Sequence, residues 1–417
     1  MATGTLPRPR TAELPALTGL RGLAAFWVLL YHVWVEATPR LMTLGSFDLT
    51  PLFSGGWAGV DIFFTLSAFL LTLPYASRQL AGAPRPSLRQ YWLRRIQRIM
   101  PAYYAQLVVL VALAALFGIG TLPTAPQVLG NLLLLNNFGA FGVMPINPVT
   151  YTIAIEFGFY LLLPLLALWL RPGRWAWLAL AAILITQLWR HLMLPQVVHL
   201  PVPLRVIALE QLPGRLDQFV VGMLAAYAYT RAAASGRLGT PLRNDLLLLT
   251  GVALFAALLW AIHYTIGTFW EGAPLLFVWH GLAGVATALI LYACACGSRL
   301  GRLAFDVPPL RWLGLISFGL YLWHFPVLQW LDAAHAFDAI GGYRLPWMLP
   351  VVLGLSCAIA AVSFRWIERP FLRLGRPRAA HPQATTEMIV AGDRGAVQAD
   401  RLAERIDSTP SRSPPCA

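Results

Sequence analysis

The hydrophobic positions of this chain fall into ten long runs that are separated by short polar stretches. A helix needs about 20 residues to cross the roughly 30 Å of hydrocarbon in a bilayer, and each run is close to that length. The pattern therefore predicts an all-α integral membrane protein with about ten transmembrane helices. They are expected at 15–37, 56–77, 99–121, 148–170, 175–194, 208–230, 245–267, 274–296, 311–334 and 345–368.

The remaining segments have other patterns. Residues 125–137 are apolar but short and contain Pro126, so an interfacial or re-entrant piece is expected there. The first run is not expected to be a cleaved signal peptide, because it is long, holds Arg21 and lacks a small-residue cleavage site. From residue 379 the chain turns polar and aperiodic. We expect a membrane domain over 1–378 and a disordered cytoplasmic tail over 379–417.

Composition agrees with lipid as the main solvent. Hydrophobic residues make up 58% of the chain and charged residues 12%, against about 45–50% and about 25% in soluble domains. So few charges cannot cover a water-facing surface of this size. A cytosolic enzyme, a secreted disulfide scaffold and a DNA-binding module are thereby excluded.

The net charge of +13 is explained by topology. All 31 basic residues are Arg, and cytoplasmic loops collect basic residues. With the N-terminus inside, 21 Arg fall on the cytoplasmic side and four on the other. This predicts that both termini are cytoplasmic in a multi-pass protein of the cell membrane. Cys294 and Cys296 lie two apart in an apolar run, which is a poor spacing for a metal site or a disulfide, so neither is expected.

Ionisable residues at bilayer depth are costly and therefore candidates for function. Arg21 and His32 lie eleven residues apart in the first run, so they share one helix face about 16 Å apart along the axis. Together they suggest a polar path from the cytoplasm to the membrane centre. The alternative is an Arg that snorkels to the interface and a His that only packs.

Two more such residues lie near the middle of their runs. Glu156 falls in the fourth run and His324 in the ninth, two residues before Pro326. That proline is expected to free a backbone carbonyl and bend its helix. A buried acid bonded to a hydroxyl, and a His that only packs, are the structural alternatives.

Other charged residues lie closer to the two membrane faces. Asp61 is expected in the outer half, as a substrate contact or as the partner of an Arg. Arg215 and Asp217 are expected to pair with each other. On the cytoplasmic side, Arg95 and Arg98 are helix neighbours. They suit phosphate oxygens, although anionic lipid headgroups also account for the charge.

Six segments in order resemble the integral-membrane acyltransferase 3 family. They are Leu17–Ala25 with His32, Gly59–Phe69, Tyr91–Pro101, Tyr151–Tyr160, Ser317–Pro326 and Ile367–Pro370. The match covers nearly all of 15–378. Ala68 and Tyr151 depart mildly from the family pattern, where Gly and Trp are common. The chain is similar to the stand-alone members that have no fused esterase-like domain.

The resemblance implies an enzyme that transfers acyl groups to a hydroxyl. The donor would be acetyl-CoA or another acyl-CoA, used as co-substrate, with no bound cofactor and no metal. The acceptor would be an envelope sugar, a lipid-linked glycan or a macrolide. Arg21, Arg95 and Arg98 would hold the phosphates of CoA.

The same resemblance assigns the chemistry to His32. An imidazole can remove the proton of an alcohol near neutral pH, as general base, or can itself accept the acyl group. Glu156 would hold its tautomer, as the acid does in a hydrolytic triad. His324 would orient the acceptor or carry a second proton, and Asp61 would contact substrate. Direct and two-step transfer both stay open.

Two other classes of protein compete with this prediction. A proton-coupled transporter of an anionic solute would also use midplane His and Glu with a basic mouth. It should show helices broken by Gly or Pro in two matching halves, and the sequence has no such pattern. A lipid-binding scaffold would leave His32, Glu156 and His324 unexplained.

Overall fold

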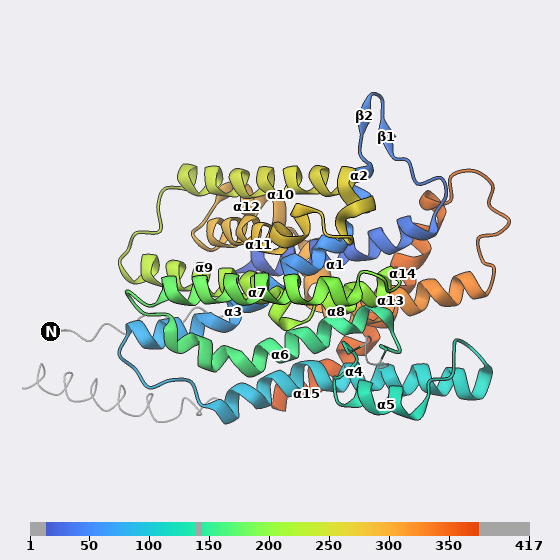
Figure 1. Cartoon of the computed structure of the whole chain (residues 1–417), viewed down its shortest axis with the longest axis horizontal. Coiled ribbons are helices and arrows are strands. Elements are labelled where there is room, and N and C mark those ends of the chain that lie inside the picture. The colour runs from blue at the N-terminus through green and yellow to red at the C-terminus, as the bar shows by residue number, and fades with distance from the viewer. Residues whose placement is uncertain (1–13, 139–143, 375–417) are drawn as a thin grey trace, which may run out of the picture. The chain divides into compact units, whose positions relative to one another are not determined.

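The described part of the chain contains ten long helices, one for each predicted run. The computed structural model describes residues 14–138 and 144–374, so the predicted tail and the N-terminus lie outside the described residues. The long helices are α1 (Pro15–Glu36), α3 (Gly59–Leu80), α4 (Leu88–Phe117), α6 (Tyr151–Leu166), α7 (Trp175–Val197), α9 (Leu216–Ala234), α10 (Pro241–Phe269), α11 (Pro274–Ala295), α13 (Pro308–Ala333) and α14 (Leu345–Ser363). Many of their axes run in similar directions (Figure 1).

Short elements join these helices. They are α2 (Thr50–Ser54), α5 (Ala125–Leu132), α8 (Val202–Leu209), α12 (Arg299–Phe305) and α15 (Arg369–Leu374), with 3-10 turns at Gly56–Ala58, Pro148–Thr150, Ala167–Trp169 and Leu212–Arg215. A π-helical turn, η7 (Phe364–Glu368), joins α14 to α15. Strands β1 (Thr43–Leu44) and β2 (Phe47–Asp48) pair antiparallel and protrude beyond the helices (Figure 1).

Length and apolar composition confirm an all-α integral membrane protein. Within the described residues, eight helices or continuous helical stretches are long and apolar enough to span a bilayer. Helices α9 and α13 are not among the eight, and both carry buried polar side chains, such as Gln218 and His324. Their polar groups face other helices, so the chain can bury them without exposing them to lipid.

Two predicted boundaries are wrong. Helix α4 begins at Leu88, because the Ser87 side chain accepts a hydrogen bond from the Gln90 N–H and caps it. The Arg-rich segment is therefore the first part of α4 and does not precede it. The predicted run 208–230 is divided, since Pro213 lies in a 3-10 turn and α9 begins only after that turn.

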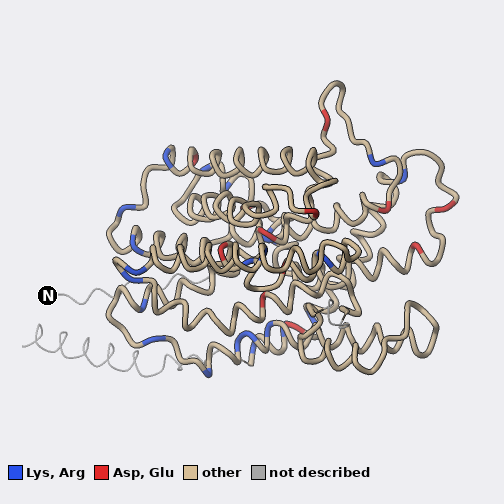
Figure 2. The backbone as a smooth tube through the Cα atoms, in the orientation of Figure 1, with Lys and Arg blue, Asp and Glu red and all other residues tan. Residues whose placement is uncertain are grey.

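The surface has the character of a lipid-facing bundle. Large apolar side chains stay exposed on the outer helices, for example Val108 on α4 and Leu188 on α7. Arg positions gather mainly toward the end where α9 joins α10, and the opposite end carries mostly acidic positions (Figure 2). This asymmetry agrees with the sequence count of 21 Arg on one predicted side of the membrane and four on the other. Which end faces the cytoplasm stays a prediction.

Glycines allow α1 and α13 to pack backbone to backbone. A Cβ added to Gly314 would lie 1.9 Å from the carbonyl oxygen of Thr18. A Cβ added to Gly22 would lie 2.1 Å from the carbonyl oxygen of Leu310. Small residues allow this approach between membrane helices. The tight packing of α1 on α13 brings together two histidines that the sequence places 292 residues apart.

Candidate active site

His32 on α1 and His324 on α13 form a pair of adjacent imidazoles. Nδ1 of His32 lies 3.2 Å from Nε2 of His324, and the ring centroids are 5.0 Å apart. His324 is 1% exposed and His32 is half-buried. The sequence predicted each residue at mid-membrane but did not predict that they meet.

The hydrogen bonds of the pair define where the protons lie. Nδ1 of His324 is 3.1 Å from the carbonyl oxygen of Leu320, and Nδ1 of His32 is 2.9 Å from that of Val28. Because a carbonyl can only accept, each Nδ1 carries the proton. Nε2 of His324 is then a lone-pair acceptor for His32. Nε2 of His32 also carries a lone pair, and no residue of 14–138 or 144–374 hydrogen-bonds to it.

Arg21 lies three turns before His32 and, like it, contacts α13. Its Nε donates to the carbonyl oxygen of Gly314 at 2.9 Å, and Nη2 donates to the same oxygen. Ser317 Oγ also donates to this carbonyl, at 3.0 Å. The predicted common face of Arg21 and His32 is therefore confirmed. The Arg21 guanidinium was predicted to hold the phosphates of CoA, but two of its nitrogens instead hydrogen-bond α1 to α13.

The other two predicted arginines are linked to Arg21 in series, because Arg98 acts electrostatically on Arg21 and Arg95 is in electrostatic range of Arg98. Arg98 is near enough to Arg21 to act on it electrostatically, together with Glu368 and Glu156. Arg95 lies over the ring of Tyr160, with its guanidinium carbon 5.9 Å from the centroid. Nε of Arg95 is buried without a hydrogen-bond partner among the described residues. Three guanidinium groups and two carboxylates, carried by α1, α4, α6 and η7, are thus linked by electrostatic interactions.

Glu156 does not hold His32. Its Oε1 accepts a hydrogen bond from Ser67 Oγ on α3 at 2.5 Å, while the His32 tautomer is set by Val28 and His324. The prediction that Glu156 orients His32 is therefore corrected. The physical reason is that the backbone carbonyl one turn earlier on α1 already supplies the acceptor.

Asp61 belongs to a separate buried ion cluster and not to the histidine pair. Its Oδ1 lies 2.6 Å from Nη1 of Arg215 and 2.7 Å from Nδ1 of His280. Glu210 completes the cluster, since it pairs with Arg215 through Nη2 and with Nε2 of His280 at 2.6 Å. The expected Arg215–Asp217 pair is wrong, because Arg215 contacts the other two carboxylates. These contacts favour the structural alternative for Asp61.

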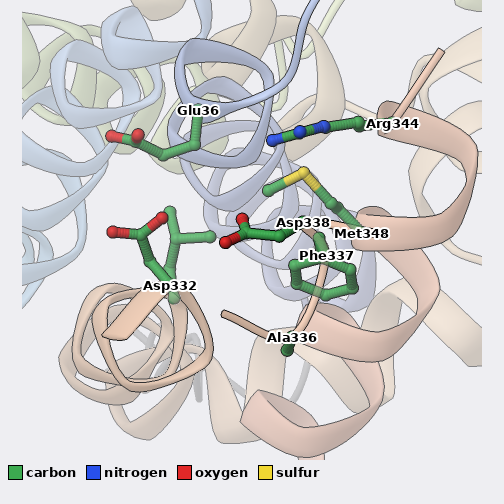
Figure 3. A pocket seen from close by; sticks show the side chains of 8 residues that line it. Glu36, Asp332, Ala336, Phe337, Asp338, Arg344 and Met348 are labelled. Carbon is green, nitrogen blue, oxygen red and sulfur yellow. The ribbon is translucent and has the colours of Figure 1, made fainter. Parts of the chain in front are cut away.

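A small pocket lies one helical turn beyond the histidine pair. Glu36 follows His32 by four residues and Leu328 follows His324 by four, a rise of about 6 Å on each helix, and both line the pocket. Asp332, Asp338 and Arg344 supply the other charges. In Figure 3 the Arg344 guanidinium reaches across toward the side of Glu36.

Several residues of these clusters escaped the sequence analysis. His280, Glu210 and Glu368 are ionisable and at most 4% exposed. The rule that selected His32 and Glu156, an ionisable residue within or beside an apolar run, would have found all three. Glu368 also lies in the π-helical turn, a feature that is frequent at functional sites.

Among the described residues, no group of three His, Cys, Asp or Glu is placed to hold a metal ion.

The helical membrane bundle holds a buried histidine pair and an arginine cluster three helical turns away, and the family is identified by comparison with known proteins. The family described as "Acyltransferase domain" matches residues 14–366. The chain therefore belongs to this acyltransferase family. It is a multi-pass bacterial membrane protein. No solved structure matches the chain.

Three curated bacterial proteins show the similarity. The chain is 28% identical to "Putative peptidoglycan O-acetyltransferase YrhL" of Bacillus subtilis, over 87% of this chain and 55% of that protein. It is 26% identical to "Peptidoglycan O-acetyltransferase OatA" of Listeria monocytogenes, over 87% and 56%. It is 23% identical to "O-acetyltransferase OatA" of Staphylococcus aureus, over 87% and 58%. The chain thus spans little more than half the length of these relatives.

Proposed function

We propose that this chain is a membrane O-acyltransferase that moves an acetyl group from an acyl-CoA to a hydroxyl of an envelope sugar. One observation carries the proposal. Nε2 of His32 presents a lone pair with no partner among the described residues, beside a second imidazole that fixes its tautomer. Family membership supports acyl transfer. The names of the Bacillus subtilis and Listeria monocytogenes relatives support a sugar acceptor.

His32 acts as the general base. Its Nε2 takes the proton of the acceptor hydroxyl while that oxygen attacks the carbonyl carbon of the thioester. The C–S bond then breaks, and the leaving thiolate takes the proton back from the imidazolium. One ester and one free thiol are formed, and His32 returns to its starting form.

His324 stabilises the charged form of His32. When Nε2 of His32 gains a proton, the ring becomes positive and its Nδ1–H becomes a stronger donor. Nε2 of His324 and the carbonyl oxygen of Val28 both accept from it. Charge-assisted hydrogen bonds are roughly twice as strong as neutral ones. This is the role that the sequence analysis gave to Glu156.

The arginine cluster binds the donor. Arg95 keeps a buried Nε with no partner among the described residues. Arg98 is close enough to Arg21 and to Glu368 to interact electrostatically with both. Guanidinium forks match phosphate oxygens. The phosphates of CoA would rest here, and its pantetheine arm would extend toward His32. Glu156 and Glu368 offset part of the positive charge.

The experiment is acyl transfer from labelled acetyl-CoA in isolated membranes. Acceptors are peptidoglycan fragments, lipid-linked sugars and a macrolide, and products are followed by mass spectrometry. We expect label in a hydroxylated acceptor with wild type and not with His32→Ala. His191→Ala is the matched control, because Nδ1 of His191 also bonds the carbonyl four residues earlier, but the ring is exposed on α7.

Two further readouts decide between the alternatives. Label found on His32 after an acid quench with donor alone shows the two-step route, and its absence during turnover shows direct transfer. Absence of transfer with every acceptor, together with uptake of labelled solute into vesicles, contradicts the proposal and favours the transporter.

A further inference from the structure

A set of buried amide side chains surrounds the turn of α13 that Pro326 interrupts. Pro326 has no N–H, so the carbonyl oxygen of Leu322, four residues earlier, loses its helical donor. Gln106 of α4 and Asn147 both donate their amide N–H to this oxygen, Asn147 at 2.9 Å. Because a carbonyl can only accept, the NH₂ of each amide must face Leu322. The amide oxygens therefore face elsewhere.

Among residues 14–138 and 144–374, these amide oxygens have no hydrogen-bond partner. Oε1 of Gln106 and Oδ1 of Asn147 are buried and accept no hydrogen bond from the described residues. The same holds for Oδ1 of Asn136, whose NH₂ donates to Thr150 Oγ1 at 3.1 Å. The three side chains are at most 1% exposed. Buried polar atoms are nearly always paired, so three unpaired acceptors in one network require an explanation.

The network is continuous and reaches the turn of α13 that carries His324. Thr150 Oγ1 donates to the backbone oxygen of Asn147 at 2.7 Å and accepts from Asn136, so all three amides are connected. Leu322 comes two residues before His324. The ring of Tyr321 lies 5.8 Å from that of His324, and its hydroxyl donates to Val149 O at 2.9 Å. One turn of α13 thus carries both the amide network and His324.

Fixing the helix does not explain the free oxygens. The repair of the Leu322 carbonyl needs donors only, and the NH₂ groups supply them. Asn131, also fully buried nearby, shows what a structural amide looks like. Its Nδ2 donates to Gln127 O and Met144 O, and its Oδ1 accepts from the Ile146 N–H. Every polar atom of Asn131 has a partner.

We propose that the amide oxygens of Gln106, Asn136 and Asn147 form the acceptor-sugar subsite beside His324. The inference rests on the proposed function. Uncharged oxygens that accept hydrogen bonds select neutral donors, namely hydroxyl and amide N–H groups. They cannot hydrogen-bond a phosphate or a carboxylate, because the oxygens of those anions accept hydrogen bonds and need donors. A neutral saccharide, with several hydroxyls around one ring, fits three such oxygens.

Asn136 gives the cleanest test. Its NH₂ meets only hydroxyl groups, those of Thr150 and Tyr103, and both have other partners. Asn136→Leu removes the free oxygen without exposing the Leu322 carbonyl. The full-length protein with His32→Ala, held in nanodiscs, is titrated with N-acetylglucosamine and its deoxy analogues, so that binding is measured without turnover. Asn136→Asp, which keeps an oxygen acceptor, is the conservative variant.

We expect Asn136→Leu to weaken sugar binding about tenfold, the loss of one good hydrogen bond. At the site that keeps Asn136, one deoxy analogue should bind about tenfold more weakly than the parent sugar. At the Asn136→Leu site, the same analogue and the parent sugar should bind with equal affinity. Asn136→Asp should keep most of the affinity. Asn131→Leu, the matched control, should lower the thermal midpoint and leave the affinity of the folded fraction unchanged.

This inference is overturned if the protein binds the sugar with the same affinity whether or not it carries Asn136→Leu. It is also overturned if no neutral sugar binds. Either result leaves acyl transfer to another hydroxylated acceptor possible. Absence of acyl transfer in wild-type membranes would instead overturn the proposed function. The binding assay therefore tests the sugar subsite, and the turnover assay separately tests the proposed function.

Discussion

Gly314→Ala tests whether the close packing of α1 on α13 holds the histidine pair in place. The added methyl would lie 1.9 Å from the Thr18 carbonyl oxygen, where ordinary contact begins at 3.4 Å. The backbones would have to separate by the difference, 1.5 Å. Thr18 cannot move away by a side-chain rotation, because the contact is with its backbone. Overpacking of this kind costs about 1–3 kcal/mol.

The same shift should reach the active site. Gly314 lies ten residues before His324, about 15 Å along α13, and it also accepts the Arg21 hydrogen bonds. Separation of the helices by even part of 1.5 Å takes the 3.2 Å contact between His32 and His324 beyond hydrogen-bond range. A misplacement of about 1 Å can cost about 100-fold in rate. We expect a loss of this size in kcat.

The assay is acyl transfer with thermal unfolding of the same detergent-solubilised samples. Gly354→Ala on α14 is the matched control, since an added Cβ there meets nothing within 4 Å. It should keep full activity and an unchanged or slightly higher thermal midpoint. Wild-type activity and stability in Gly314→Ala would refute the reasoning.

Three other substitutions separate the remaining parts of the account. Arg95→Ala should raise the KM for acetyl-CoA about tenfold and leave the acceptor KM unchanged; a rise in the acceptor KM alone would contradict the donor assignment. Asp61→Asn should destabilise the fold by about 3 kcal/mol or more, because it leaves Arg215 short of a buried partner, and an unchanged thermal midpoint would contradict the ion cluster. Pro326→Ala should restore the helical hydrogen bond to Leu322 and lower kcat without loss of stability, as read from activity and thermal unfolding together.

Much of the fold was predictable because the bilayer imposes one strong rule. Segments of about 20 apolar residues must form helices when lipid surrounds them, so all ten runs appear as helices. Two of the helix starts were not predictable from hydropathy. The start of α4 moved to Leu88 because the Ser87 cap lies in a polar stretch that hydropathy does not register. Pro213 divided another run for a local backbone reason.

The site was predictable as a set of residues and not as a set of contacts. Depth in the membrane selected His32, His324, Glu156 and the arginines, because charge and polarity are costly there. Which side chains meet depends on helix packing. The His32–His324 contact follows from the α1–α13 approach through glycines, and nothing in the local pattern around Glu156 shows that its partner is Ser67. Residues distant in sequence meet only when the helices are assembled.

The most direct test of the central claim is the acyl-transfer rate of His32→Ala in membranes with saturating acetyl-CoA and sugar acceptor. General-base catalysis contributes about 10²–10⁴-fold, so the account predicts a loss of at least about 100-fold. The Arg21–Gly314 contact does not involve the imidazole, so the thermal midpoint should stay close to wild type. A folded His32→Ala protein that transfers acyl groups within tenfold of the wild-type rate would contradict the assignment of His32 as the base.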